Sequence, residues 1–131
     1  MSKTIAGSAR CPCSSGNVYS ECCGPIIAGA PAPTAERLMR SRFTAFVIGD
    51  EQYLLRSWHP STRPGGLDLD DATRWLWLEI TLTEGGGPFD AEGTVVFVAA
   101  YRDASGRGEL RERSRFVRDG RDWLYVDGDV G

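Results

Sequence analysis

The chain of 131 residues contains one histidine, no apolar run long enough to cross a membrane and no N-terminal segment with the apolar core of a secretory signal. We therefore expect a cytoplasmic protein that does not use a membrane. The net charge of -3 does not indicate general affinity for nucleic acid. Any acid–base chemistry that depends on histidine has to use His59.

Nucleotide-binding and hydrolase fingerprints are also lacking. The glycines from Gly85 to Gly87 precede a proline and no expected helix, so they do not form a phosphate-binding loop. No serine lies in the setting of a nucleophile elbow. The hydrophobic fraction of 41% is nevertheless typical of a globular protein, and the length fits one domain of roughly 100 to 150 residues with a short appended element.

The four cysteines lie together near the start of the chain. Cys11, Cys13, Cys22 and Cys23 form the pattern C-x-C-x8-C-C. Zn²⁺ takes four tetrahedral ligands at Zn–S distances of about 2.3 Å, and two close cysteine pairs joined by a loop can supply all of them. The pattern therefore predicts one structural Zn²⁺ ion with no open position for water. A disulfide or redox site is the alternative, which a reducing compartment and the strain of bonding Cys22 to Cys23 disfavour.

Three segments follow from the composition: a zinc knuckle at 1–28, a linker at 29–33 and a second domain at 34–131. Prolines at 25, 31 and 33 indicate a connecting segment that is not helical. Apolar residues at helical spacing after Thr34 predict a helix over 35–48 that ends at Gly49. Asp50 is the expected N-cap of a shorter helix over 51–58.

Beyond residue 74 the hydrophobic period changes from 3.6 to 2, which predicts strands at 75–83, 94–102, 109–118 and 122–127. The second is apolar on both faces and so should be central, and Asp119-Gly120 is a hairpin turn. In the first strand one face should carry Leu76, Leu78, Ile80 and Leu82. The expected fold is α+β, with two helices against a curved four-stranded antiparallel sheet.

The segment Cys11-Pro12-Cys13-Ser14-Ser15-Gly16, with Tyr19 and Cys22-Cys23-Gly24, resembles the SEC-C motif, the zinc knuckle at the C-terminus of the SecA translocation motor. The rest is similar to the YchJ-like SEC-C proteins in segments at 38–46, 58–64, 97–101 and 114–116. This resemblance implies an NTF2-like, cystatin-related cone for the second domain. Phe43 stands where such proteins often carry a tyrosine, and no second cysteine knuckle follows, so we expect no bivalent binding through two knuckles.

Two residues are candidates for catalysis. Alternation along the third strand places Glu112 and Ser114 on one face, and if that face is concave, Glu112 can act as a base. The interpretation that we favour is a core ion pair of Glu112 with Arg40 or Arg42, since the helix that carries these arginines must cover the sheet. His59 either acts as a base or caps the end of the second helix.

Further residues are candidates for binding a ligand in the cone. Arg40 or Arg63 would anchor an anion. The remaining candidates for the pocket are Arg42, Ser114 and Trp75.

Three functions remain open. The first, which the sequence favours, is an adaptor that docks on a protein partner through its zinc knuckle. The second is a small-molecule binder, or an enzyme of the lyase or isomerase type, that uses the cone. The third, not favoured by the acidic balance, is an RNA or ribosome contact through the knuckle and the arginines of the third strand: Arg111, Arg113, Arg115 and Arg118.

Overall fold

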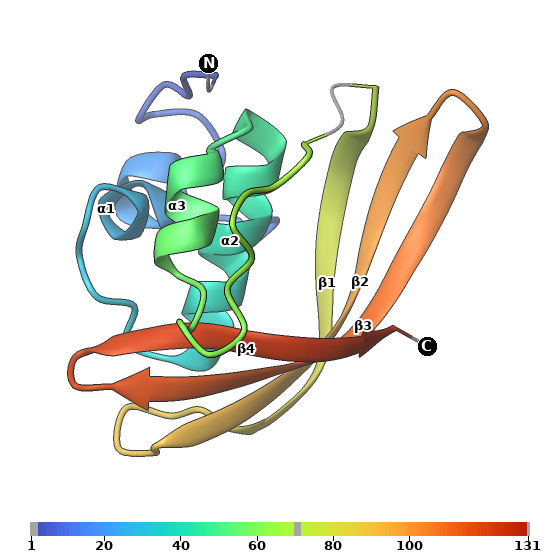
Figure 1. Cartoon of the computed structure of the whole chain (residues 1–131). Helices are drawn as coiled ribbons and strands as arrows, with labels where there is room; N and C mark the ends of the chain where they lie inside the picture. The colour runs from blue at the N-terminus through green and yellow to red at the C-terminus, as the bar shows by residue number, and fades with distance from the viewer. Residues whose placement is uncertain (1–2, 70–71, 131) are drawn as a thin grey trace.

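The computed structural model describes residues 3–69 and 72–130. Residues 1–2 and 131, at the ends of the two predicted domains, lie outside the described residues, as do residues 70–71. The cysteine segment comes first, the helices follow, and a four-stranded antiparallel meander of order β1-β2-β3-β4 completes the chain (Figure 1). The predicted α+β fold is confirmed.

The cysteine segment contains helical structure that the sequence analysis did not predict. A 3-10 turn, η1, spans Tyr19–Glu21, and the short helix α1 spans Cys23–Ile27. The expectation that Pro25 belongs to a non-helical segment was wrong. Pro25 lies in the first turn of α1, where a backbone N–H has no partner within the helix and its loss therefore costs little.

The two predicted helices are present as α2, Ala35–Ile48, and α3, Glu51–Arg56. The hydroxyl of Thr34 accepts a hydrogen bond from the N–H of Arg37 at 3.1 Å, and Gly49 ends α2 in the left-handed region at φ 76°. Helix α3 ends two residues earlier than predicted. The backbone after it pairs with the last strand instead, with the N–H of His59 donating to the carbonyl of Tyr125 at 2.7 Å.

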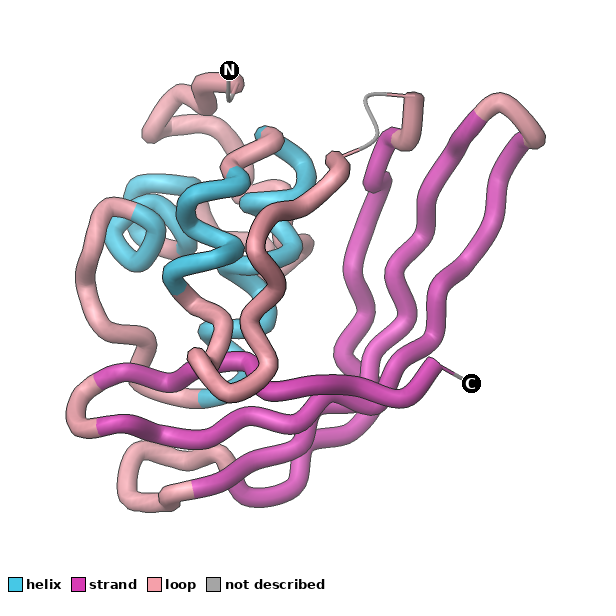
Figure 2. Tube along the Cα trace, viewed as in Figure 1, coloured by secondary structure: helices cyan, strands magenta, loops and turns pink. Residues whose placement is uncertain are grey.

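The four strands are β1 (Arg74–Gly85), β2 (Glu92–Asp103), β3 (Gly106–Asp119) and β4 (Asp122–Val130). Each one extends beyond its predicted range. The sheet is strongly bent, and the helices lie on its concave side, as the traces in Figures 1 and 2 show. Strands β2 and β3 are central, as expected for β2.

The expected core face of β1 was right for Leu78 and Ile80 and wrong for Leu76 and Leu82. Register shifts between Trp75 and Trp77 and between Ile80 and Leu82 insert an extra residue at two places. Each bulge reverses the faces beyond it. Trp75 therefore packs against the core, whereas Leu82 is 48% exposed.

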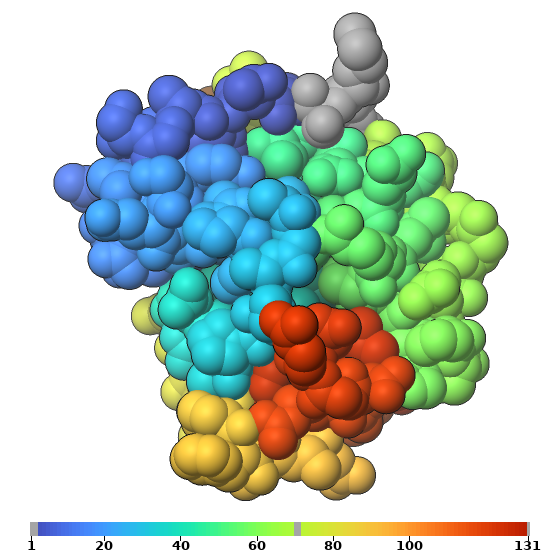
Figure 3. Space-filling model, turned by 90° about the vertical axis from the view of Figure 1, so that its left-hand side faces the viewer, coloured from blue at the N-terminus to red at the C-terminus, as the bar shows by residue number. Residues whose placement is uncertain are grey.

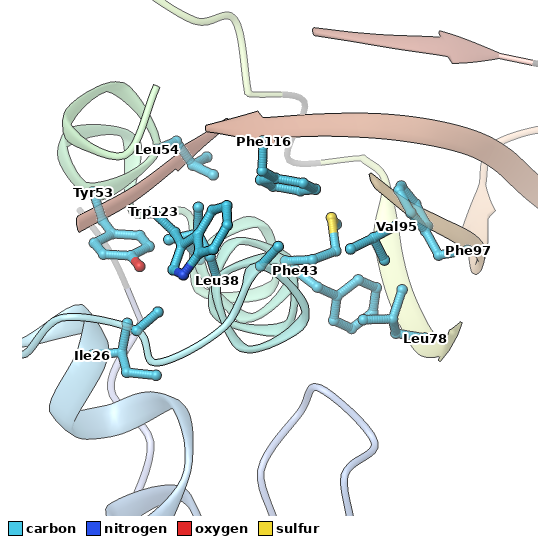
Figure 4. Packing of buried hydrophobic residues seen from close by; sticks show 14 of the residues in the cluster. Ile26, Leu38, Phe43, Tyr53, Leu54, Leu78, Val95, Phe97, Phe116 and Trp123 are labelled. Atoms are coloured by element: carbon cyan, nitrogen blue, oxygen red, sulfur yellow. The ribbon is translucent and has the colours of Figure 1, made fainter. Parts of the chain in front are cut away.

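The core lies between α2, α3 and the concave face of the sheet. Leu54, Val95, Phe116 and Trp123 are among its most deeply buried side chains (Figure 4). Helix α2 contacts β1, β2 and β4, so it is the element around which the sheet bends. The bend leaves space beside α2, and this space is where the candidate site lies.

Candidate functional site

The four cysteine side chains form one buried cluster. Their sulfur atoms all lie within 4.8 Å of one another, and each residue is at most 3% exposed. A tetrahedral ion with Zn–S bonds of about 2.3 Å needs sulfurs about 3.8 Å apart. The donor set and its spacing therefore fit a soft divalent metal ion.

Short-range contacts shape this cluster. The hydroxyl of Ser15 lies 3.2 Å from the sulfur of Cys22, and Gly16 turns the loop at φ 92°. Hydrogen bonds with Cys13 and Cys23 lower the pKa of the Cys11 thiol, and the hydrogen bond to Cys11 raises the pKa of Cys13 to about 11.

The knuckle is held against α2 and β1 by three polar contacts. Arg40 donates from Nη1 to the carbonyl of Cys13 at 2.8 Å. The hydroxyl of Thr44 lies 3.7 Å from the sulfur of Cys11, and the hydroxyl of Ser14 accepts from the N–H of Leu78 at 3.1 Å. The inner face of the knuckle is therefore occupied within the same chain.

A cavity of about 240 Å³ lies between α2 and the bent sheet. Half of its lining residues are aromatic: Phe43, Phe46, Trp58, Trp75, Phe97 and Tyr125. Its polar side chains are Arg42, Glu112 and Ser114. The cavity can therefore enclose a small, largely apolar molecule with a few polar groups.

Arg42 is a buried cation in the wall of this cavity, only 3% exposed. Its Nη1 donates to the carbonyl of Leu54 at 2.8 Å and to the hydroxyl of Ser57 at 2.6 Å, and its guanidinium lies 4.6 Å from the ring centre of Tyr125. Burial lowers the pKa of Arg42 to about 10. Within residues 3–69 and 72–130, no carboxylate forms an ion pair with it.

Glu112 projects into the same cavity from β3. Its Oε2 accepts a hydrogen bond from Ser114 at 2.5 Å and another from the hydroxyl of Tyr125 at 3.4 Å. No arginine lies within ion-pair distance of this carboxylate in the described part of the chain, so the expected core ion pair is not formed. Glu112 instead raises the pKa of Tyr125 to about 12, together with burial, which is the larger cause.

The comparisons with known proteins identify the family. The family described as YchJ, middle NTF2-like domain, matches residues 34–128. The chain belongs to the YchJ family. The UPF0225 protein SCO1677 of Streptomyces coelicolor is 54% identical over 120 residues, which is 91% of this chain and 94% of that protein. A UPF0225 protein of Chromobacterium violaceum is 45% identical over 127 residues, 93% of each chain.

Two solved structures of SEC-C motif proteins share the fold. The solution structure of RPA3114 from Rhodopseudomonas palustris has a TM-score of 0.81 and 30% identity, and covers 92% of this chain and 98% of that one. The crystal structure of a protein from Psychrobacter arcticus has a TM-score of 0.77 and 26% identity, and covers 97% and 86%. The predicted resemblance to YchJ-like SEC-C proteins and the NTF2-like fold are thus confirmed.

Three predicted site residues of this YchJ family member lie outside the cavity. Arg40 pairs with Glu36 at 3.1 Å and faces the knuckle. Nδ1 of His59 accepts from the N–H of Ser61 at 3.1 Å, and Arg63 donates twice to the carbonyl of Trp58. The structure thus places His59 in a turn and Arg63 on a loop, and it brings together Arg42, Trp75, Glu112 and Ser114.

The arginines of β3 mostly have acidic partners. Arg113 pairs with Glu84 at 2.6 Å, and Arg115 pairs with Asp127 and Asp129 at 2.6 and 2.9 Å. Arg111 lies 3.6 Å from Glu109, and Arg118 donates to the carbonyl of Pro88. Neutralised arginines offer little to a phosphate backbone, so this strand does not favour a nucleic-acid interface.

The sequence analysis missed several aromatic residues of the cavity as site residues, among them Phe46 and Trp58. Phe46 follows Arg42 at i+4 on the same helix, so its spacing could have identified it. Trp58 reaches the cavity only because its backbone forms a parallel bridge to Tyr125 of β4, 67 positions later. No pattern of neighbouring residues in the sequence indicates this pairing.

Among the described residues, no helix is long and apolar enough to span a membrane.

Proposed function

We propose that this protein binds a small organic acid with an apolar, aromatic body in the cavity between α2 and the sheet. The observation that carries the proposal is Arg42, a buried guanidinium that faces an aromatic cavity without a carboxylate partner among the described residues. A buried charge is costly unless it is paired. A ligand carboxylate would provide that pairing, while its apolar body replaces water against the rings.

The metal site belongs to this proposal as a structural part. The four buried cysteines are free, which fits a reducing compartment such as the cytoplasm, and zinc is the ion that tetrathiolate sites of this kind prefer. A closed tetrahedron leaves the ion no position for substrate. In this proposal Zn²⁺ holds the knuckle in the shape that contacts α2 and β1.

The knuckle adaptor has less support. Protein-binding surfaces depend on a few large, buried anchors such as Trp, Tyr and Arg. The large hydrophobic side chains that are exposed in the described residues are Leu76, Trp77, Leu82, Phe89 and Val130, all outside the knuckle. Residues 15–17 of the knuckle loop are small and polar, so this loop offers no such anchor.

The binding proposal can be tested with phenylacetate as the probe and 2-phenylethanol as its neutral counterpart. The indole N–H resonances of ¹⁵N-labelled protein serve as reporters, because Trp58 and Trp75 line the cavity and Trp77 is exposed. We expect phenylacetate to shift the Trp58 and Trp75 signals in a saturable way, with Trp77 unchanged. Equal effects of the acid and the alcohol would remove the role given to Arg42.

Variants of two arginines sharpen the test. Arg42→Met should weaken phenylacetate binding by at least about tenfold, because a charge-assisted hydrogen bond is worth about 1.5–3 kcal/mol. Arg63→Met is the matched control, since Arg63 is exposed and, among the described residues, is bonded only to the carbonyl of Trp58. Arg42→Lys keeps the charge, and it provides the comparison if Arg42→Met does not fold.

Catalysis in the same cavity is a second candidate, favoured by the unpaired carboxylate of Glu112. Its Oε2 is fixed by Ser114 and Tyr125, which positions the carboxylate to take a proton from a bound acid. With phenylpyruvate as the probe, Glu112 would accept a C3 proton while the electron pair moves to the carbonyl oxygen as an enolate. We expect faster exchange of the C3 protons with D₂O and its loss in Glu112→Gln. Exchange at the uncatalysed rate in the native protein would rule this candidate out.

A further inference from the structure

A second cavity, of about 340 Å³, lies where the knuckle helix, the linker, α3 and β4 meet. Its apolar wall includes Ile26, Ala32, Leu38 and Leu124. None of its lining residues belongs to the first cavity. Figure 3 looks onto the face where these segments of the chain come together. Ligand binding here is a proposal separate from the function proposed above, although Ser57 of this cavity accepts a hydrogen bond from Arg42 of the first.

Trp123 gives this cavity an unpartnered hydrogen-bond donor. The residue is 2% exposed, and its Nε1 is the one buried side-chain nitrogen or oxygen of the described residues that lacks a hydrogen-bond partner. In Figure 4 the indole nitrogen lies at the edge of the ring nearest Tyr53 and Ile26, both of which line the cavity. Buried donors are rarely left unpaired in native proteins, so this one calls for an acceptor.

Three other polar side chains of the cavity wall already have partners. The hydroxyl of Tyr53 is bonded to Ser41 at 2.6 Å, and the hydroxyl of Ser57 donates to the carbonyl of Tyr53 at 2.8 Å. Arg56 donates from Nη2 to the carbonyl of Ile27 at 2.8 Å. None of these three side chains is bonded to Nε1 of Trp123, and a bound molecule that carries an acceptor would satisfy this donor.

We propose that the second cavity binds a small aliphatic carbonyl compound, whose oxygen accepts the hydrogen bond of Trp123 Nε1. The apolar walls would take up the aliphatic part, and Arg56 and Asp122, one cation and one anion, line the cavity as well. A carboxylic acid and an amide share this carbonyl chemistry. The linker wall carries no helix or strand at residues 29–33, so it is the part that can shift to admit a ligand.

Hexanamide, hexanoate and hexylamine test the proposal on the full chain. We expect the amide, the acid or both to move the indole N–H resonance of Trp123 in a saturable way, with a Kd below about 1 mM. Hexylamine, which offers no carbonyl oxygen, should leave this resonance in place. Comparing the amide with the acid shows whether Arg56 favours a charged ligand. The Trp123→Phe variant assigns the resonance.

Two alanine variants provide the matched comparison. Ala30→Leu fills the cavity from an exposed linker position and should abolish the shift of Trp123. Ala28→Leu adds the same side chain at a nearby exposed position outside the cavity, and should preserve the shift. If no carbonyl probe moves the Trp123 resonance, or if Ala30→Leu responds like the native protein, the proposal is wrong. The proposal would also be wrong if the indole proton of Trp123 lay close to a bound water molecule and did not respond to any probe.

Discussion

Gly128 controls how closely Glu112 can lie against β4. A side-chain carbon at position 128 would be 2.4 Å from Oε2 of Glu112, far inside contact distance. Gly128 faces Ser114 across the β3–β4 pair, so the same small residue lets Ser114 and Glu112 share their hydrogen bond. The arrangement of polar side chains at this end of the first cavity thus depends on residue 128 having no side chain.

Substituting Gly128→Ala should therefore disturb the cavity and the sheet together. The added methyl group displaces the Glu112 carboxylate or the β4 backbone, and overpacking of this kind costs about 1–3 kcal/mol. Urea unfolding of the variant measures the loss. Gly65→Ala is the control, because no atom lies within 4 Å of its added carbon. Equal stability of Gly128→Ala and the native protein would show that Glu112 is not held as the structure describes.

Helix α2 is the element that connects the two candidate sites. Arg40 and Thr44 contact the knuckle, whereas Met39, Arg42 and Phe43 line the first cavity. Residues three and four apart share a face of a helix, so this helix of 14 residues contacts the knuckle with one face and lines the first cavity with another. The knuckle therefore packs against the element that carries the buried cation.

The Arg40→Met substitution should weaken metal retention by about tenfold. Arg40 holds the carbonyl of Cys13, and groups that orient metal ligands typically contribute at least this factor to affinity. Competition with a chromophoric chelator measures the change in zinc affinity. Arg37→Met serves as the comparison on the same helix, since only the backbone of Arg37 forms a hydrogen bond in the described residues. Identical zinc affinity in both variants would contradict this role of Arg40.

At the scale of the whole molecule, the knuckle and the sheet should melt as one unit. The three polar contacts that Arg40, Thr44 and Leu78 make with the knuckle contribute about 3 kcal/mol at roughly 1 kcal/mol each. Because metal binding folds such sites, zinc removal should eliminate these contacts. We expect a single cooperative transition whose midpoint falls by roughly 10 °C.

Circular dichroism with and without a chelator checks this expectation. The variant with all four cysteines replaced by serine should melt at the lower temperature and should not respond to the chelator. An unchanged melting temperature of the native protein after zinc removal would show that the linker separates two independent bodies.

Much of the fold was predictable because its signals act over a few residues. Thr34 and Gly49 define the ends of α2 through hydrogen bonds and dihedral angles of their own neighbourhood. The change of hydrophobic period predicted all four strands, and Asp119-Gly120 the last hairpin. The bulges in β1 were not predictable, since the register is decided by the partner strand β2.

The candidate metal centre was predictable for the same reason. Four cysteines within thirteen positions can meet whatever the rest of the chain does, and the structure brings their sulfurs together. The first cavity was only partly predictable, because it assembles residues from α2, the loop after α3 and all four strands. The sequence alone did not indicate which of several arginines lines this cavity.

By itself, then, the sequence determined the cysteine cluster, the ends of α2 and the order of α2, α3 and the four strands, all of which depend on contacts between near neighbours along the chain. The tertiary structure alone decided that Arg42 and not Arg40 faces Glu112, that His59 stays in a turn, and that Trp123 is buried without a partner. Each of these outcomes depends on how the sheet bends around α2. That bend brings together segments distant in sequence, and no local pattern records which side chains it will pair.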